Sequence, residues 1–151
     1  MTTVCIVGDP TVDVRAELLS RETAREAIAP YDLDAPWINT IAMETVSLGM
    51  AVSLLNDLNW YLVRFATLAM VQEPSISDRE WLSRALASAV RDGDVEREES
   101  DRFVAIYGVD KGRLVEPLYT TRRPGAALPS YDLRDVDETV VVRVTPEEFG
   151  G

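Results

Sequence analysis

The sequence predicts an α+β domain that is mostly helical, with about four to five helices packed on a small sheet. Short β-branched runs near residues 3–7, 113–119 and 138–144 are typical of strands. Helical patterns fill the chain between the first two runs, and a hydrophobic content of 46% is enough for a buried core. We expect one globular domain over residues 1–146 and a frayed tail over 147–151.

The first part of the chain predicts one strand and one helix. The apolar run at 4–7 is typical of a strand buried on both faces, and a turn at 8–10 ends it. Asp13 is a good N-cap for the next element, and Pro30 stops it. We therefore expect a helix over residues 13–29.

The segment 37–71 is the most apolar part of the chain and carries three charged residues. Its richness in Ala, Leu and Met favours helix, and its apolar side chains recur at helical spacing. Asn and Asp prefer helix ends to helix interiors, so residues 56–59 predict a break between two apolar helices. A strand over 60–71 is the alternative, because a short apolar run fits both structures.

The clearest helix signal follows this segment. Ser77 and Glu80 have the spacing of a capping box, in which each residue caps the backbone of the other. We expect a helix that begins there and ends at the Asp-Gly-Asp sequence of residues 92–94.

The last third of the chain predicts strands at its end and is ambiguous at its start. The segment 98–107 predicts a helix, but a hairpin from 103–107 into 113–119 is the alternative. Pro117 assigns the second of these strands to an edge or a bulge. Valines at alternate positions of 139–144 predict a half-buried last strand.

The charge balance is strongly acidic. Net charge is -11, from 26 acidic and 15 basic side chains, and the basic ones are 14 arginines and the single Lys111. In dilute buffer these charges repel one another, whereas near 1 M salt the Debye length falls to about 3 Å and the repulsion nearly vanishes. We therefore expect a halophilic protein, and an arginine bias from a GC-rich genome is the alternative.

Location follows from what the chain lacks. The longest uncharged run, residues 45–56, has 12 residues and is too short to span a membrane. The first residues show no basic leader. We expect a cytoplasmic protein that has no membrane association.

The composition also excludes several classes of chemistry. The chain has no histidine and one cysteine, Cys5, which excludes Ser-His-Asp and Cys-His catalysis, His-ligated metals and an internal disulfide. We expect no catalytic residue, no metal and no cofactor, and we interpret Cys5 as a buried apolar residue.

Two candidate ligand-binding residues lie in the first half of the chain. Asp9 belongs to a strand-to-helix turn, where nucleotide folds hold phosphates, but a single glycine and the charge of Asp9 favour a structural turn. Arg64 lies in an apolar run, so it either reaches the surface or pairs with an acid, and pairing is the interpretation that we favour; a ligand-facing arginine is the alternative. The acids available for pairing are Glu44, Asp57 and Glu73.

Arg122 and Arg123 form the other candidate. They are the only adjacent basic pair of the chain, and arginine suits phosphate or carboxylate groups. Pairing with nearby acids is the interpretation that we favour.

Three stretches resemble a haloarchaeal family of unknown function. The residues that carry the likeness are Glu44-Thr45-Val46-Ser47-Leu48-Gly49, Asn56-Asp57-Leu58-Asn59-Trp60-Tyr61-Leu62-Val63-Arg64-Phe65 and Arg113-Leu114-Val115-Glu116-Pro117-Leu118-Tyr119. The resemblance extends over nearly the whole chain and implies a halophilic source. It implies no activity, cofactor or site residue.

The leading functional hypothesis is a non-enzymatic, cytoplasmic interaction or regulatory module. Because the predicted sheet is too small to cover all the apolar helix, we expect self-association or docking on a partner protein through apolar helical surface. The candidate interface residues are Trp60, Tyr61 and Met70.

Two alternatives remain open. The first is a small-ligand or nucleotide-binding protein that uses the Gly8-Asp9 turn together with Arg64 or Arg122. The second is association with RNA or the ribosome through Arg122 and Arg123.

Overall fold

The computed structural model of this chain describes residues 1–122 and 138–150. Its strands form one mixed sheet with the order β2-β1-β3-β4-β8-β5-β6, and β7 also pairs with β5. Neighbouring strands are antiparallel except β4 and β8, which are parallel. The elements in chain order are β1 (Thr2–Gly8), α1 (Val14–Leu19), α2 (Glu22–Ile28), β2 (Thr40–Thr45), α3 (Leu48–Asp57), α4 (Asn59–Phe65), β3 (Ala66–Gln72), β4 (Trp81–Ser83), α5 (Arg84–Asp92), the 3₁₀ turn η1 (Arg97–Glu99), β5 (Phe103–Asp110), β6 (Arg113–Leu114), β7 (Leu118–Thr121), β8 (Glu138–Arg143) and α6 (Pro146–Gly150).

The prediction of a mostly helical domain is wrong. The strands predicted near 3–7, 113–119 and 138–144 correspond to β1, to β6 and β7, and to β8. Four further strands, β2, β3, β4 and β5, occupy segments for which the sequence predicts helix. Among the described residues the longest helix, α3, has ten residues. The error has a physical cause, since strands buried on both faces are apolar throughout and lose the alternation that marks a strand.

The apolar segment 37–71 shows this cause directly. All but one of the residues of β2 are buried, so the run has no polar face. The break between two helices is confirmed, since α3 ends at Asp57 and α4 begins at Asn59. The strand alternative for 60–71 is correct for its second half, which forms β3.

The capping box at Ser77 and Glu80 does not start a helix. The Ser77 hydroxyl accepts a hydrogen bond from the Glu80 amide at 3.0 Å. The Glu80 carboxylate, however, accepts hydrogen bonds from Arg122 and Arg143 and does not cap the Ser77 backbone. Helix α5 begins after Ser83, whose hydroxyl accepts from the Leu86 amide. Gly93, with φ of 81°, ends α5 where the sequence predicts.

The hairpin alternative for the last third of the chain is confirmed. β5 turns at residues 110–112 into β6, with Asp110 opposite Arg113, so the helix predicted for 98–107 is wrong. The valines of β8 alternate as predicted, because Val140 and Val142 are buried beside a partly exposed Val141. Where a frayed tail was expected from residue 147, the structure has the short helix α6.

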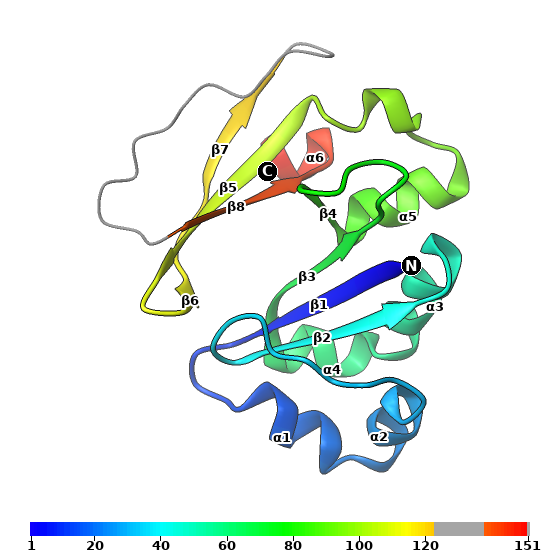
Figure 1. The fold of residues 1–151 in the computed structure, drawn as a ribbon, viewed down its shortest axis with the longest axis vertical. Coiled ribbons are helices and arrows are strands. Elements are labelled where there is room, and N and C mark those ends of the chain that lie inside the picture. The colour runs from blue at the N-terminus through cyan, green and yellow to red at the C-terminus, as the bar shows by residue number, and fades with distance from the viewer. Residues whose placement is uncertain (123–137, 151) are drawn as a thin grey trace.

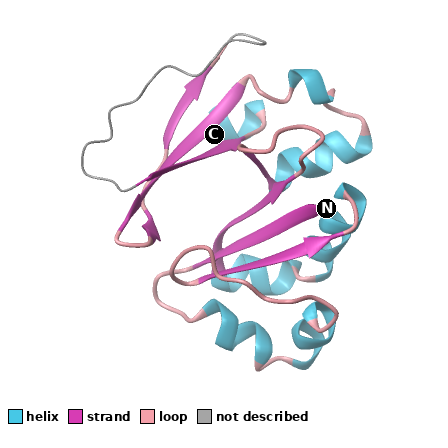
Figure 2. Ribbon diagram, viewed as in Figure 1, coloured by secondary structure: helices cyan, strands magenta, loops and turns pink. Residues whose placement is uncertain are grey.

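The sheet has two arms joined by β4, with β1, β2 and β3 in one arm and β5, β6, β7 and β8 in the other (Figure 1). Helices α1–α5 cover one side of the first arm with a core that includes Val4 and Ile6 of β1 (Figure 2). The alternate residues of β1, Cys5 and Val7, belong to a second core together with Val142 of β8. The side chains of this second core therefore join the two arms.

The loop before β2 connects the two ends of the sheet. The Ile38 amide donates to the Gly112 carbonyl of the β5–β6 turn at 2.7 Å. In the same loop, Trp37 Nε1 donates to the Glu138 carboxylate at 2.8 Å. The Trp37 ring packs edge to face on the Trp81 ring, with 6.3 Å between the ring centroids. Because β2 and β6 are the end strands of the sheet order, these contacts hold the two ends of the curled sheet close to each other.

Candidate functional site

The turn after β1 requires a glycine. A Cβ atom on Gly8 would lie 2.6 Å from Asn39 Nδ2 and 2.7 Å from the Val14 Cβ atom, closer than such atoms approach. The absence of a side chain therefore lets the end of β1 pack directly against Asn39 and the first residue of α1.

Asn39 holds this turn in place. Its Oδ1 accepts from the Val14 amide at 2.9 Å, and its Nδ2 donates to the carbonyls of Asp9 and Val12 at 3.0 and 2.9 Å. Its own carbonyl accepts from the Gly8 amide at 2.8 Å. The backbone of Asn39 is left-handed, with φ of 57°, a conformation that asparagine tolerates better than most residues.

A cleft lies beside this turn. Two cavities of about 360 and 380 Å³ share Pro10, Ile38, Asn39 and Arg113, and we call the pair the turn cleft. The smaller cavity extends along the start of α1 to Arg15. The larger one extends between the two arms of the sheet, against β3, β5 and β6. Ligand sites commonly have volumes in this range and occur where sheets curl or switch partners.

Two arginines of the turn cleft have no partner among the described residues. Arg15 and Arg113 line the cleft, and no hydrogen bond, ion pair or ring contact within 1–122 and 138–150 involves either side chain. The carboxylate of the neighbouring Asp13 is engaged, since it accepts from the Ala16 amide at 3.1 Å. The smaller cavity therefore offers two open guanidinium groups, which are suited to carboxylate or phosphate.

Asp9 shapes the turn and is not among the residues that line the cleft. Its carboxylate accepts from the Thr11 hydroxyl at 2.6 Å and from the Thr11 amide at 2.8 Å, and these bonds lower the pKa of Asp9. This pattern is that of a local side-chain turn, as the structural interpretation of the sequence predicts.

Arg64 lies on the surface and forms no ion pair with Glu44, Asp57 or Glu73, so the favoured interpretation, pairing with an acid, is wrong. Its Nη1 donates to the Trp60 carbonyl at 2.8 Å, and its guanidinium lies 3.7 Å from the centroid of the Trp60 ring. The stacking keeps the charge in water while the ring shields the side-chain stem.

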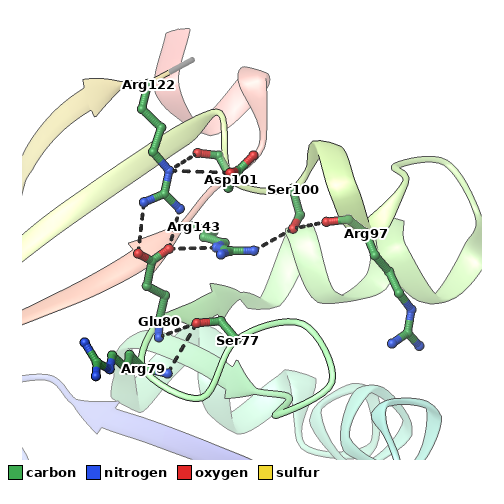
Figure 3. Close-up of polar contacts among 8 residues, drawn as sticks. All are labelled: Ser77, Arg79, Glu80, Arg97, Ser100, Asp101, Arg122 and Arg143. Atoms are coloured by element: carbon green, nitrogen blue, oxygen red, sulfur yellow. Dashed lines mark hydrogen bonds and ion pairs between the residues drawn. The ribbon is translucent and has the colours of Figure 1, made fainter. Parts of the chain in front are cut away.

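Arg122 belongs to a largely buried ion network (Figure 3). Its Nη1 donates to a Glu80 oxygen at 2.9 Å and its Nη2 to the other, while its Nε donates to the Asp101 carbonyl at 2.6 Å. Arg143 donates to the same Glu80 carboxylate at 2.8 Å and to the Ser100 hydroxyl at 2.9 Å. We call these five residues the Glu80 network. It joins the segment before β4 to the end of β7 and to β8, and the favoured pairing of Arg122 with acids is what the structure contains.

The Glu80 carboxyl illustrates two opposed effects on one pKa. Burial raises the pKa of Glu80, but the hydrogen bonds and charges of Arg122 and Arg143 outweigh burial and lower it. The Arg122 side chain is 6% exposed, so its guanidinium does not face solvent. Arg123, its predicted partner in binding, lies outside the described residues.

The candidate interface residues separate into different environments. Trp60 is 48% exposed on α4, whereas Tyr61 is half-buried and Met70 is buried in the second core. Because the sheet covers most of the apolar helix faces, the exposed apolar surface of α4 is limited to Trp60 and Val63.

Cys5 is fully buried, and desolvation raises the pKa of its thiol to about 12. Within the part of the chain that the structure describes, no group of three or more Cys, Asp or Glu side chains is arranged to hold a metal ion. Among the described helices, none has the length and apolar character that crossing a bilayer requires.

Sequence reasoning missed Asn39, Arg15 and Arg113. The tolerance of asparagine for left-handed backbone is the one local signal at Asn39, and many loop asparagines share it. Arg113 could have been placed at a hairpin turn from the sequence, but its position beside Gly8 depends on the Ile38–Gly112 contact between distant segments.

Comparison with known proteins gives a family and no function. No curated protein and no solved structure matches the chain. A family of unknown function, DUF5804, matches residues 2–109, which is more than two thirds of the chain. The match includes Gly8, Arg15, Asn39 and Glu80 and ends before Arg113. The chain therefore belongs to the DUF5804 family of unknown function.

Proposed function

We propose that this protein is a non-enzymatic regulatory module that binds a small acidic ligand in the turn cleft. The observation that carries the proposal is that Arg15 and Arg113 line one cleft and have no partner among the described residues, in a chain whose net charge is -11. In so acidic a chain, an arginine that lines a cavity and forms no ion pair within residues 1–122 and 138–150 is available to an anion.

The local structure supports binding by a site that is already formed. Gly8 and Asn39 fix the turn on one side of the cleft through four hydrogen bonds of 2.8 to 3.0 Å. A site held in its binding conformation loses less conformational entropy when the ligand arrives. We propose binding and not catalysis because the sequence has no histidine and its one cysteine is buried.

A thermal-shift screen with carboxylates and phosphates tests this proposal. We expect at least one compound to raise the melting temperature of the wild-type protein, and Arg113→Gln to weaken its binding about tenfold or more, the loss expected of a charged hydrogen bond. Arg25→Gln on α2 is the matched control, because it removes the same charge from an exposed residue that does not line the cleft. A panel without any stabilising compound, or equal binding by Arg113→Gln, would overturn the proposal.

Self-association through α4 is the second candidate function. It is supported by the exposure of Val63, 72%, next to Trp60, whose ring is held by Arg64 on one side. We expect Val63→Glu to lower the molar mass measured by light scattering at high salt. A wild-type protein that is monomeric at every concentration would remove this candidate.

Association with RNA or the ribosome has the least support. It required accessible side chains on Arg122 and Arg123, and the Arg122 guanidinium is held by Glu80 and Asp101. Charge reversal at both arginines with no change in sedimentation with ribosomes would end this alternative.

The proposed setting is the cytoplasm of a salt-accumulating, haloarchaeal cell. The excess of acidic residues and the nearly complete use of arginine as the basic residue support it. Its test is the dependence of the free energy of unfolding on salt concentration.

A further inference from the structure

We infer that the ligand of the turn cleft is an amphiphilic anion, with a flat, apolar body and a single carboxylate or phosphate group at one end. This inference rests on the proposed function and adds the chemical class of the ligand. It follows from the different chemistry of the two cavities.

The smaller cavity suits the acidic group. Arg15 and Arg113 both line it, and their guanidinium groups have no partner in the described chain. The Asp13 carboxylate at the same cavity is already bonded to the Ala16 amide, so it caps α1. A carboxylate or phosphate placed here would complete the hydrogen bonds of both arginines.

The larger cavity suits an apolar body. Its walls include the aliphatic side chains of Val7, Leu68 and Leu114 and the rings of Tyr107 and Tyr119. Flat aromatic faces favour stacked or edge-on contact with another ring, and burial of apolar surface drives such binding. Because Arg113 lines both cavities, an acid bound to it can be joined directly to a body in the larger cavity.

Glu116 limits the ligand to one acidic end. This residue lines the larger cavity and is exposed, and no hydrogen bond or ion pair within the described residues engages its carboxylate. A second acidic group on the far end of the body would approach the charge of Glu116, and like charges repel. The cleft should therefore reject a ligand with an acid at each end.

Four simple compounds separate these features. We expect naphthalene-2-carboxylate to bind about tenfold or more tightly than acetate, which lacks the body, and than naphthalene-2-carboxamide, which lacks the charge. Naphthalene-2,6-dicarboxylate should bind more weakly than the monocarboxylate. The measurement is isothermal titration calorimetry on the full chain, with circular dichroism to check the fold of each variant.

A pair of variants on β7 assigns the body to the larger cavity. Tyr119 and Leu118 are exposed to nearly the same extent, 47% and 45%, but only Tyr119 lines the cavity. We expect Tyr119→Ala to weaken naphthalene-2-carboxylate severalfold and to leave acetate unchanged, and Leu118→Ala to change neither.

The outcomes distinguish this inference from the proposed function. If acetate binds as tightly as naphthalene-2-carboxylate and Arg113→Gln weakens both, the cleft binds anions but the inferred ligand class is wrong. If the dicarboxylate binds as well as the monocarboxylate, or if Tyr119→Ala has no effect, the inference is also overturned. If no anion binds, both the inference and the proposed function fail.

Discussion

The side chain of Asn39 forms hydrogen bonds with three backbone groups of another segment of the chain. The side-chain amide group is hydrogen-bonded to the backbone of Val14, Asp9 and Val12, which lie 25 to 30 positions earlier in the chain. The backbone of Asn39 itself is left-handed. Because these partners are partly buried, their loss leaves unsatisfied groups in the fold. The shape of the turn cleft thus depends on Asn39 as well as on Gly8.

We expect Asn39→Ala to lower the free energy of unfolding by about 3 kcal/mol, from three lost hydrogen bonds and a left-handed alanine. Asn39→Gly should be about 1 kcal/mol more stable than Asn39→Ala, because glycine adopts positive φ without strain. Urea denaturation measures both values. A loss below about 0.5 kcal/mol for Asn39→Ala would show that the amide does not hold the turn.

At the scale of elements, the Glu80 network ties strands that are distant in sequence. Glu80 precedes β4, Arg122 follows β7 and Arg143 ends β8, so one carboxylate fixes the C-terminal strands to the centre of the sheet (Figure 3). The sequence indicated Glu80 as a helix cap because its spacing from Ser77 is three residues. The arginines that compete for Glu80 lie 42 and 63 positions away, beyond the reach of any local pattern.

We expect Glu80→Gln to lower the free energy of unfolding at pH 7 by about 3 kcal/mol, because two guanidinium groups lose their charged partner. The pKa of Glu80 is lowered in the folded state, so its contribution is complete above the ordinary value of 4.5 and is lost as pH falls below it. The difference between wild type and Glu80→Gln should therefore shrink below about pH 4.5.

Urea denaturation between pH 3 and pH 7 measures this difference. Glu26→Gln is the control, because Glu26 is an exposed acid of α2, and it should change the free energy of unfolding by less than about 0.5 kcal/mol. A difference between wild type and Glu80→Gln that stays constant through this range would contradict the role of the Glu80 charge.

At the scale of the molecule, a net charge of -11 opposes folding through the repulsion of surface carboxylates. We expect the free energy of unfolding to rise by about 2 kcal/mol or more between about 0.05 M and 2 M KCl, as the Debye length falls to a few ångströms. Measurement by urea denaturation at each salt concentration checks this expectation. A protein that stays natively folded at a few millimolar salt, with no gain on adding KCl, would contradict it.

A variant with five exposed acids changed to glutamine separates charge repulsion from general salting-out. It should show a smaller rise with KCl than the wild type if repulsion is the cause. The five positions are Glu22, Glu26, Glu96, Glu98 and Glu99.

The sequence by itself determined the features that depend on a few neighbouring residues. These include the N-cap at Asp13, the break before Asn59, the end of α5 at Gly93 and the alternation of β8. Each depends on the capping, the backbone conformation or the periodicity of one short segment, so each is visible locally.

Only the tertiary structure decided which apolar runs became strands and where the cleft formed. β2 and β3 are strands because both pair with β1. The sequence of an apolar run does not indicate which distant segment it will pair with. Arg113 lies beside the turn at Gly8 because the loop before β2 bonds to the β5–β6 turn. Pairing between segments that lie tens of residues apart is set by the packing of the whole sheet, which no short stretch of sequence contains.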